Sequence, residues 1–457
     1  MPRIGVLGAG IAGLTAAHHL QTHGVSVQVL EASGRAGGVI QTTQADGFLV
    51  EHGPNSLRPS GELENVLTDV NLEDERVWAD DTASTRYVVR GGEPVALPTS
   101  VGSFLSTPLF STWAKLRLLA EPFIGRRSDA DDEESLAAFT RRRLGPEVLD
   151  YAVAPFVGGV FAGRPDELSA RHAFERLVEF EREHGSLFWG AMRAERDDPA
   201  PDDAPSALFS FRNGIESLPR ALADALGDRI VYNAPVTALR PDDGQWLVET
   251  ATPNDGETTL HFDTVICTVP LHTLDQIAFD TPLDAFPLRD VHYPPVTVVA
   301  LGYERAAVDH PLDGFGLLVP PVEEQFDVLG TIFSSTLFRG RAPEGHVLLT
   351  TFVGGTRNPS LAEQSASTVQ EVVERDLNRL LAVQGDPVFA HHIEWPHAIP
   401  QYTLGYGAVK DTLRALESAH DGLYFAGNYR QGVSVGDAMA SGASAAKRLA
   451  TQLRARA

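Results

Sequence analysis

Three glycines and one glutamate near the start of the chain have the spacing of a phosphate-binding turn. Gly8, Gly10 and Gly13 follow the apolar run 3–7, and Glu31 ends the next such run. A GxGxxG turn between a strand and a helix lets backbone N–H groups approach a pyrophosphate, and an acid about 20 residues later can accept a hydrogen bond from a ribose hydroxyl. These residues therefore predict a dinucleotide site. The Glu31 carboxylate would repel a 2′-phosphate, which disfavours NADP.

A second glycine-rich turn follows directly. The segment SGRAGG contains Arg35, Gly37 and Gly38, which a plain NAD-binding unit does not require. The turn indicates a larger and more enclosed cofactor, namely a flavin dinucleotide. A simple left-handed connection is the alternative that the residues leave open.

The elements that must position these residues are a strand over 3–7, a helix over about 12–23 and a strand over 26–30. Further strands are predicted within 229–241, 245–250 and 264–270, and a helix follows a turn within 210–226. The cofactor domain is therefore assembled from separated pieces, with a last turn and helix near Val433. Residues 136–192 are helix-rich. Strand-like runs between 290 and 400, with one helix over 367–382, indicate a second, sheet-based domain.

The composition excludes several classes of function. The chain has 457 residues and a formal net charge of −24, and only three of its 37 basic residues are lysines. Such a charge repels nucleic acid and anionic lipid. No His or Cys spacing predicts a metal site, and Cys267, the single cysteine, is expected to be a small core residue in a reducing compartment. We expect neither a signal peptide nor a spanning helix, because the first strand begins at once and no apolar run reaches about 18 residues.

Three stretches between residues 97 and 205 have distinctive compositions. Residues 97–124 are rich in Leu and Phe and are interpreted as core helices of a second domain, with an interfacial surface as the alternative. The acidic run 128–135 is expected to be solvated, with Ser135 beginning a helix, and the charged, proline-rich run 195–205 is expected to be a flexible connection.

Taken together, these pieces resemble the flavin-containing amine oxidase superfamily, and within it the protoporphyrinogen and coproporphyrinogen oxidases of haem synthesis. The segments that carry the resemblance span the chain and include EHGPNS (51–56), GGVFAGRPDELSARHAF (158–174), GFGLLVP (314–320), IPQYTLGY (399–406) and GVSVGDAM (432–439).

The resemblance implies an α/β fold, α+β overall, of the p-hydroxybenzoate-hydroxylase-like type. It contains a Rossmann-type FAD domain, a β-sheet substrate domain and a helical domain. The segments expected in the FAD domain are 1–75, 205–270 and 405–457. The helical domain is expected over 95–195, where it could face a membrane, and the substrate domain over 76–94 and 271–404.

The resemblance also assigns site residues in this chain. The cofactor-binding positions are Gly8, Ala9, Gly10, Ile11, Ala12, Gly13, Glu31, Ala32, Arg35, Gly37, Gly38, Val39, Gly53, Pro54, Asn55, Ser56, Val236, Val433, Ser434 and Val435. The substrate positions are Arg86, as partner of a propionate, Asn55, and Gly316 with Leu317 as an apolar wall. Two positions depart from the pattern: Val39 stands where the superfamily often has a basic residue, and Asn55 stands where animal-type enzymes have Arg.

The activity that the resemblance implies is FAD-dependent oxidation of a porphyrinogen to a porphyrin, with dioxygen as acceptor. Protoporphyrinogen IX is placed first as substrate and coproporphyrinogen III second, and no catalytic base is identified. Amine oxidation is disfavoured because the stretch 292–304 has no lysine. A carotenoid desaturase is a weaker rival, and a non-catalytic porphyrin-binding flavoprotein is the alternative from another class. A cytoplasmic location is expected, and contact with a membrane surface or with the next haem-pathway enzyme stays open, as does the oligomeric state.

Overall fold

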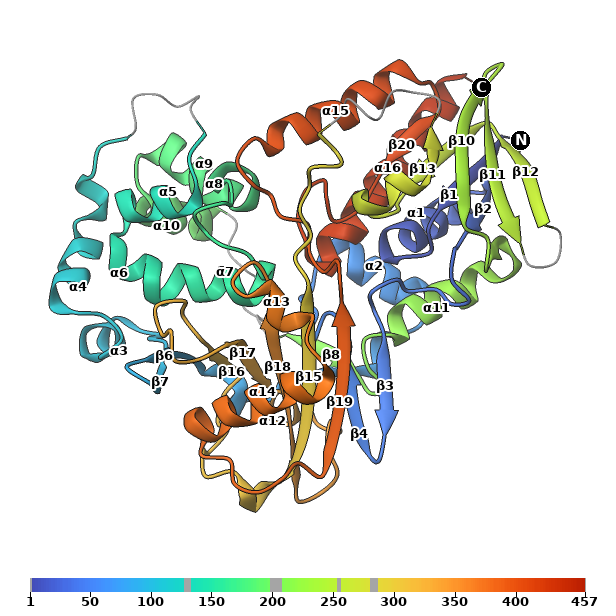
Figure 1. Ribbon diagram of the computed structural model, residues 1–457. Coiled ribbons are helices and arrows are strands. Elements are labelled where there is room, and N and C mark those ends of the chain that lie inside the picture. The colour runs from blue at the N-terminus through green and yellow to red at the C-terminus, as the bar shows by residue number, and fades with distance from the viewer. Residues whose placement is uncertain (1, 127–132, 198–207, 253–255, 280–286, 457) are drawn as a thin grey trace.

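The structure is a computed structural model that describes residues 2–126, 133–197, 208–252, 256–279 and 287–456 (Figure 1). Its first sheet is parallel and has the order β20-β13-β1-β2-β9. The strands are β1 (Arg3–Leu7), β2 (Ser26–Leu30), β9 (Ile230–Val231), β13 (Thr264–Cys267) and β20 (Leu423–Phe425). The strands predicted over 3–7 and 26–30 are confirmed to the residue.

Helices from both ends of the chain cover this sheet. Helix α1 (Ile11–Thr22) packs against α16 (Val435–Arg456) and α11 (Ser217–Leu226), and their apolar faces share one buried core. The first and last segments of the chain therefore lie side by side (Figure 1). A four-stranded sheet of order β12-β11-β10-β14 adjoins it, with β10 (Val236–Asp242), β11 (Gln245–Thr252), β12 (Gly256–Phe262) and β14 (Ala278–Phe279).

The third sheet has seven strands in the order β19-β15-β18-β17-β16-β6-β7. The long central strands β15 (Val296–Glu304) and β18 (His346–Gly354) are almost wholly buried, as sheet strands covered on both faces must be. Helix α14 (Ala366–Leu381) covers one face, and α7 (Ala154–Phe161) approaches β16 and β17. The remaining strands are β6 (Arg86–Arg90), β7 (Glu93–Ala96), β16 (Gly316–Leu318), β17 (Val328–Phe333) and β19 (Phe389–Trp395).

Helices between residues 101 and 197 form a separate cluster at the left of Figure 1. Helix α5 begins where predicted, because the side chain of Ser135 accepts a hydrogen bond from the N–H of Ala138. Most of the acidic run and most of the proline-rich run lie outside the described residues. The helices of the cluster are α3 (Val101–Ser106), α4 (Thr112–Leu119), α5 (Leu136–Arg143), α6 (Pro146–Val148), α7, α8 (Ala170–Ala173), α9 (Glu175–His184) and α10 (Leu187–Asp197).

A β-hairpin, β3 (Thr42–Ala45) and β4 (Phe48–Glu51), joins the first sheet to the third. It packs on the seven-stranded sheet, where the ring of Phe48 stacks on Phe389 with centroids 4.6 Å apart. The domain division stays a prediction. Strand β14 lies in the segment expected in the substrate domain, but it pairs with β10 of the four-stranded sheet. Other elements are α2 (Gly61–Asp69), β5 (Arg76–Trp78), β8 (Phe209–Phe211), α12 (Ser334–Leu337), α13 (Pro359–Ala362) and α15 (Tyr406–Ala419).

Candidate cofactor and substrate site

The first glycine turn lies at the carboxyl end of β1. Gly8 has φ of +99°, a left-handed conformation that favours glycine, and a side chain on Gly13 would overlap the carbonyl oxygen of Gly8. The Glu31 carboxylate, at the end of β2, accepts a hydrogen bond from the N–H of Ala9 at 2.7 Å. Ile11 and Ala12 form the first turn of α1 and are buried. Strand, turn, helix and acid thus have the arrangement that the spacing predicted.

The second glycine turn lies against the first. The N–H of Gly37 donates to the carbonyl of Ala9 at 2.8 Å, and Gly37 forms a bridge with Gly10. The Arg35 guanidinium closes this turn, since it donates to the carbonyls of Ala36, Gly38 and Ile40. The turn is therefore part of the same cradle, which favours the cofactor role over a simple connection.

The segment Gly53–Ser56 continues the cradle beyond β4. A Cβ on Gly53 would lie 2.6 Å from the carbonyl oxygen of Val39, so the two turns are in contact. The side chain of Asn55 donates to the carbonyl of Gly53 at 3.0 Å, and the indole of Trp395 on β19 donates to the carbonyl of His52 at 2.9 Å. The Gly53–Ser56 turn is therefore attached through His52 to the seven-stranded sheet.

The start of α16 meets the same region. Ser434 caps this helix, because its hydroxyl accepts a hydrogen bond from the N–H of Asp437. The Asp437 carboxylate in turn accepts hydrogen bonds from the N–H and the hydroxyl of Ser434. The buried hydroxyl of Ser60, next to the Gly53–Ser56 turn, has no hydrogen-bond partner within the described ranges and lies near Gly436. Val433 and Val435 flank Ser434.

Residues 231–236 run beside the end of β2. The N–H of Ala234 donates to the carbonyl of Glu31 at 2.9 Å, and Asn233 donates to the carbonyl of Ser33 at 3.0 Å. Val236, predicted to lie near the adenine, starts β10 directly after this contact. Ala32 is exposed on the same edge.

Three of the predicted substrate residues come together on neighbouring strands. Arg86 on β6 lies opposite Gly316 on β16, and its guanidinium carbon is 5.4 Å from the ring centroid of Phe315. No carboxylate among the described residues pairs with Arg86. The exposed Arg86 is therefore available for an anionic ligand.

The side chain of Leu317 does not face the helical cluster. Leu317 is 2% exposed and belongs to the core beneath α14, whereas its neighbour Leu318 packs with residues of β6 and the helical cluster. Phe156 and Val160 on α7 are partly exposed on the helical side. Alternation along the strand puts Leu317 and Leu318 on opposite faces of the sheet, and the sequence does not say which face meets a ligand. No sequence signal marks Phe156 and Val160, which lie on a helix.

A buried ion pair beneath the cradle was also not predicted. Glu51, the last residue of β4, and Arg341, from the loop after α12, are 4% and 2% exposed in their side chains and lie 3.5 Å apart. Burial raises the pKa of the Glu51 carboxyl, opposed by the Thr42 hydroxyl and by Arg341, and burial lowers the pKa of Arg341. No local sequence signal joins two residues so far apart in the chain.

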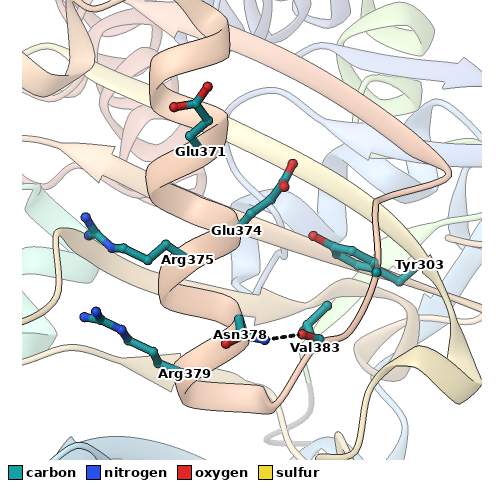
Figure 2. A pocket seen from close by; sticks show the side chains of 8 residues that line it. Tyr303, Glu371, Glu374, Arg375, Asn378, Arg379 and Val383 are labelled. Carbon is teal, nitrogen blue, oxygen red and sulfur yellow. Dashed lines mark hydrogen bonds between the residues drawn. The ribbon is translucent and has the colours of Figure 1, made fainter.

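A separate surface pocket of about 360 Å³ lies between α14 and β15 (Figure 2). Its lining mixes carboxylates and guanidinium groups, and the Asn378 amide donates to the carbonyl of Val383 at 2.7 Å. None of the predicted site residues lines it, so we place the site at the cradle. Within the described part of the chain, no group of three His, Cys, Asp or Glu side chains could hold a metal ion.

The cradle residues fit a flavin dinucleotide. A Cβ on Gly10 would meet nothing within 4 Å, so open space lies beside the N-terminus of α1, where a pyrophosphate needs close backbone approach. Glu31 has the chemistry to hold a ribose hydroxyl. The second turn and the start of α16 add backbone groups that a smaller dinucleotide does not require.

Comparisons with known proteins agree with this geometry. Residues 11–450 match the family described as flavin containing amine oxidoreductase. The chain is 35% identical to protoporphyrinogen oxidase 2 of Arabidopsis thaliana, covering 97% of this chain and 93% of the relative, and 28% identical to coproporphyrinogen III oxidase of Bacillus subtilis, covering 98% of both. A crystal structure of a proposed protoporphyrinogen oxidase from Exiguobacterium sp. 255-15 has a TM-score of 0.81, with 23% identity and 99% of each chain covered, which shows the shared fold. The chain belongs to the flavin containing amine oxidoreductase family, and its cofactor is FAD.

Proposed function

We propose that this protein oxidises a porphyrinogen to a porphyrin in haem biosynthesis, with protoporphyrinogen IX as the first candidate substrate and dioxygen as acceptor. The observation that carries the proposal is the pairing of β6 with β16. It sets Arg86, which has no carboxylate partner among the described residues, beside Gly316 on the seven-stranded sheet, and Trp395 of this sheet is bonded to the turn that begins at His52. The sequence relatives with porphyrinogen oxidase names support the same substrate class. Coproporphyrinogen III is the alternative.

The chemistry divides between cofactor and protein. FAD supplies the electron acceptor for hydrogen removed from the macrocycle. The chain's own residues bind, orient and exclude water: Arg86 meets a carboxylate of the substrate, and the apolar side chains of Leu318, Phe156 and Val160 contact its macrocycle. The strand β15 contains no lysine, which disfavours amine oxidation.

The charge of the substrate makes Arg86 important. A porphyrinogen carries at least two carboxylates, and the protein has a formal net charge of −24. Local cations must therefore overcome a generally repulsive field. A guanidinium without a protein carboxylate among the described residues is suited to this task, because it can form a charge-assisted, bidentate hydrogen bond.

The test is aerobic incubation of the FAD-loaded protein with coproporphyrinogen III and with protoporphyrinogen IX, followed by porphyrin fluorescence. We expect oxidation faster than the spontaneous rate, with protoporphyrinogen IX the better substrate. A preference for coproporphyrinogen III would reverse the order of the substrates. No acceleration with either would contradict the enzymatic proposal and favour a porphyrin carrier.

We further propose that the helical cluster touches a membrane surface from the cytoplasmic side. Apolar side chains of α3, α4 and the turn after them are exposed, with Trp113 at 82% and Phe123 at 90%. The only acid between residues 97 and 126 is Glu121, which is buried, while Lys115, Arg117 and Arg126 add positive charge. This combination is typical of interfacial surfaces. Within the described ranges, none of the helices has the length and hydropathy to cross a bilayer. Contact with the next haem-pathway enzyme is the competing use of this face.

A further inference from the structure

The buried pair Glu51–Arg341 is the centre of a polar chain that links the two glycine turns to the substrate sheet. Glu51 accepts a hydrogen bond from the hydroxyl of Thr42 at 2.6 Å and from the N–H of Ile215 at 3.0 Å. Arg341 donates to the hydroxyl of Ser210 at 2.6 Å and to the carbonyl of Phe211 at 3.3 Å. Three segments of the chain, namely the β3–β4 hairpin, residues 210–215 and the loop that holds Arg341, therefore converge on one ion pair.

The chain of contacts continues from Thr42 to the cofactor cradle. The N–H of Thr42 donates to the carboxylate of Glu216 at 2.9 Å, and that carboxylate lies 4.0 Å from the guanidinium of Arg35. Arg35 in turn closes the second glycine turn through three backbone carbonyls. In the other direction, the N–H of Leu49 donates to the carbonyl of Arg341 at 3.1 Å, which fixes the hairpin to the sheet.

Stability alone does not account for this arrangement. A buried ion pair carries a large desolvation cost, and apolar side chains of similar volume are often as stabilising. Here the two charges lie 3.5 Å apart, and the Nη1 atom of Arg341 is buried without a hydrogen-bond partner in the described residues. Directional bonds that join these three segments instead fix their relative geometry, which apolar packing does less specifically.

We propose that Glu51, Arg341 and Thr42 are positioning residues, which hold the His52–Ser56 turn and the second glycine turn in one fixed relation to the substrate sheet. Glu51 immediately precedes that turn, and Thr42 lies two residues after Ile40, the last residue whose carbonyl Arg35 binds. The pair thereby sets how the cofactor turn faces the substrate. This inference rests on the proposed function in one respect, because it takes the turn to lie between FAD and substrate.

The helical cluster contains a matched control. Glu121 and Arg143 form a second buried pair, 2% and 0% exposed in their side chains, and Glu121 accepts a hydrogen bond from the hydroxyl of Ser186 at 2.6 Å. The Thr42–Glu51 bond has the same length and the same chemistry. Removing either hydroxyl leaves a buried carboxylate short of one donor, but only Thr42 lies at the cofactor cradle.

The first experiment compares Thr42→Val, Thr42→Ser and Ser186→Ala by thermal unfolding of the apoprotein, by the FAD dissociation constant and by the visible spectrum of bound flavin. We expect Thr42→Val to raise the FAD dissociation constant about tenfold and to shift the flavin spectrum, because one charge-assisted hydrogen bond is lost. Thr42→Ser keeps the hydroxyl and should behave as the wild type. Ser186→Ala should lower the unfolding temperature without changing either flavin readout. Equal flavin readouts for Thr42→Val and Ser186→Ala would overturn the proposal.

The second experiment tests the pair itself and does not depend on the first. The double variants Glu51→Gln/Arg341→Met and Glu121→Gln/Arg143→Met both remove a buried pair without leaving a lone charge. We expect both to fold, and only the first to weaken FAD binding and alter the flavin spectrum. If Glu51→Gln/Arg341→Met keeps the wild-type FAD affinity and flavin spectrum, the pair has only a structural role. Neither readout needs a substrate, so failure of the porphyrinogen assignment would leave this test interpretable.

Discussion

The carbonyl oxygen of Ala12 occupies the space in which a side chain on Gly442 would begin. One residue lies in the first turn of α1, and the other lies in α16 near the opposite end of the chain. The close approach lets two helix N-termini face the same cradle, because no side chain separates their backbones. This contact supports the proposal that the two ends of the chain form one cofactor site.

We therefore expect Gly442→Ala to disrupt that approach. The added Cβ would overlap backbone, which cannot move aside as a flexible side chain can, so the free energy of unfolding should fall by about 1–3 kcal/mol. FAD should also dissociate faster. Urea unfolding and flavin release would measure both effects.

Gly61→Ala is the control, because a Cβ at Gly61 would meet nothing within 4 Å. This variant should be as stable as the wild type or slightly more stable, by about 0.5–1 kcal/mol. If Gly442→Ala matched Gly61→Ala in both measurements, the helices would not be held by this contact.

Contacts within one short unit of the chain could be predicted from the sequence, whereas contacts between distant segments could not. The turn through Gly8 and Gly13 and the acid Glu31 lie within one strand–turn–helix–strand unit, so their spacing alone determines their relation. The contact between Glu51 and Arg341 needs the hairpin and the seven-stranded sheet to be docked, which no local pattern encodes. Leu317 illustrates a third case, because it is expected in an apolar wall against the substrate but lies in the core beneath α14, and Leu318 occupies the opposite face of the strand.

Arg86→Ala should raise the KM for the porphyrinogen about tenfold or more while kcat changes little. The residue binds a carboxylate that is unchanged by the reaction, so it contributes equally to the ground state and the transition state. Steady-state kinetics with both candidate porphyrinogens would measure the effect. The wild-type KM should also rise with salt more steeply than that of the variant.

Arg339→Ala is a suitable comparison for Arg86. Arg339 is 89% exposed in its side chain and pairs only loosely with Asp80, at 3.6 Å. Exposed pairs of this kind contribute little, so KM should stay at the wild-type value. An unchanged KM in Arg86→Ala as well would remove Arg86 from the substrate site.

The double variant Trp113→Ser/Phe123→Ser should bind lipid vesicles more weakly than the wild type. Each aromatic side chain loses roughly 1.5–3 kcal/mol of favourable transfer when it no longer enters an apolar phase. Cosedimentation with phosphatidylglycerol vesicles would measure this, and phosphatidylcholine vesicles would separate the contribution of Lys115, Arg117 and Arg126. Val322→Ser, at an apolar residue that is 47% exposed in the turn between β16 and β17, is the control. Wild-type protein that fails to bind either vesicle would refute the membrane contact and leave the partner enzyme as the occupant.

Because Cys267 is buried, we expect it to make protein stability depend on pH, and Cys267→Ala isolates this contribution. Burial raises the pKa of its thiol from 9.0 to about 12, partly offset by a backbone hydrogen bond from Val269. Between these two values the unfolded thiol loses its proton and the folded thiol keeps it, so the unfolded state binds fewer protons and stability falls as pH rises. This group should contribute a decline of about 1.4 kcal/mol per pH unit over that window and none below pH 9. The difference between the unfolding free energies of the wild type and Cys267→Ala, measured in urea at several pH values, removes the contributions of Lys and Tyr. A difference that stays constant through pH 11 would mean that water reaches the thiol at the carboxyl end of β13, beside the cofactor turn.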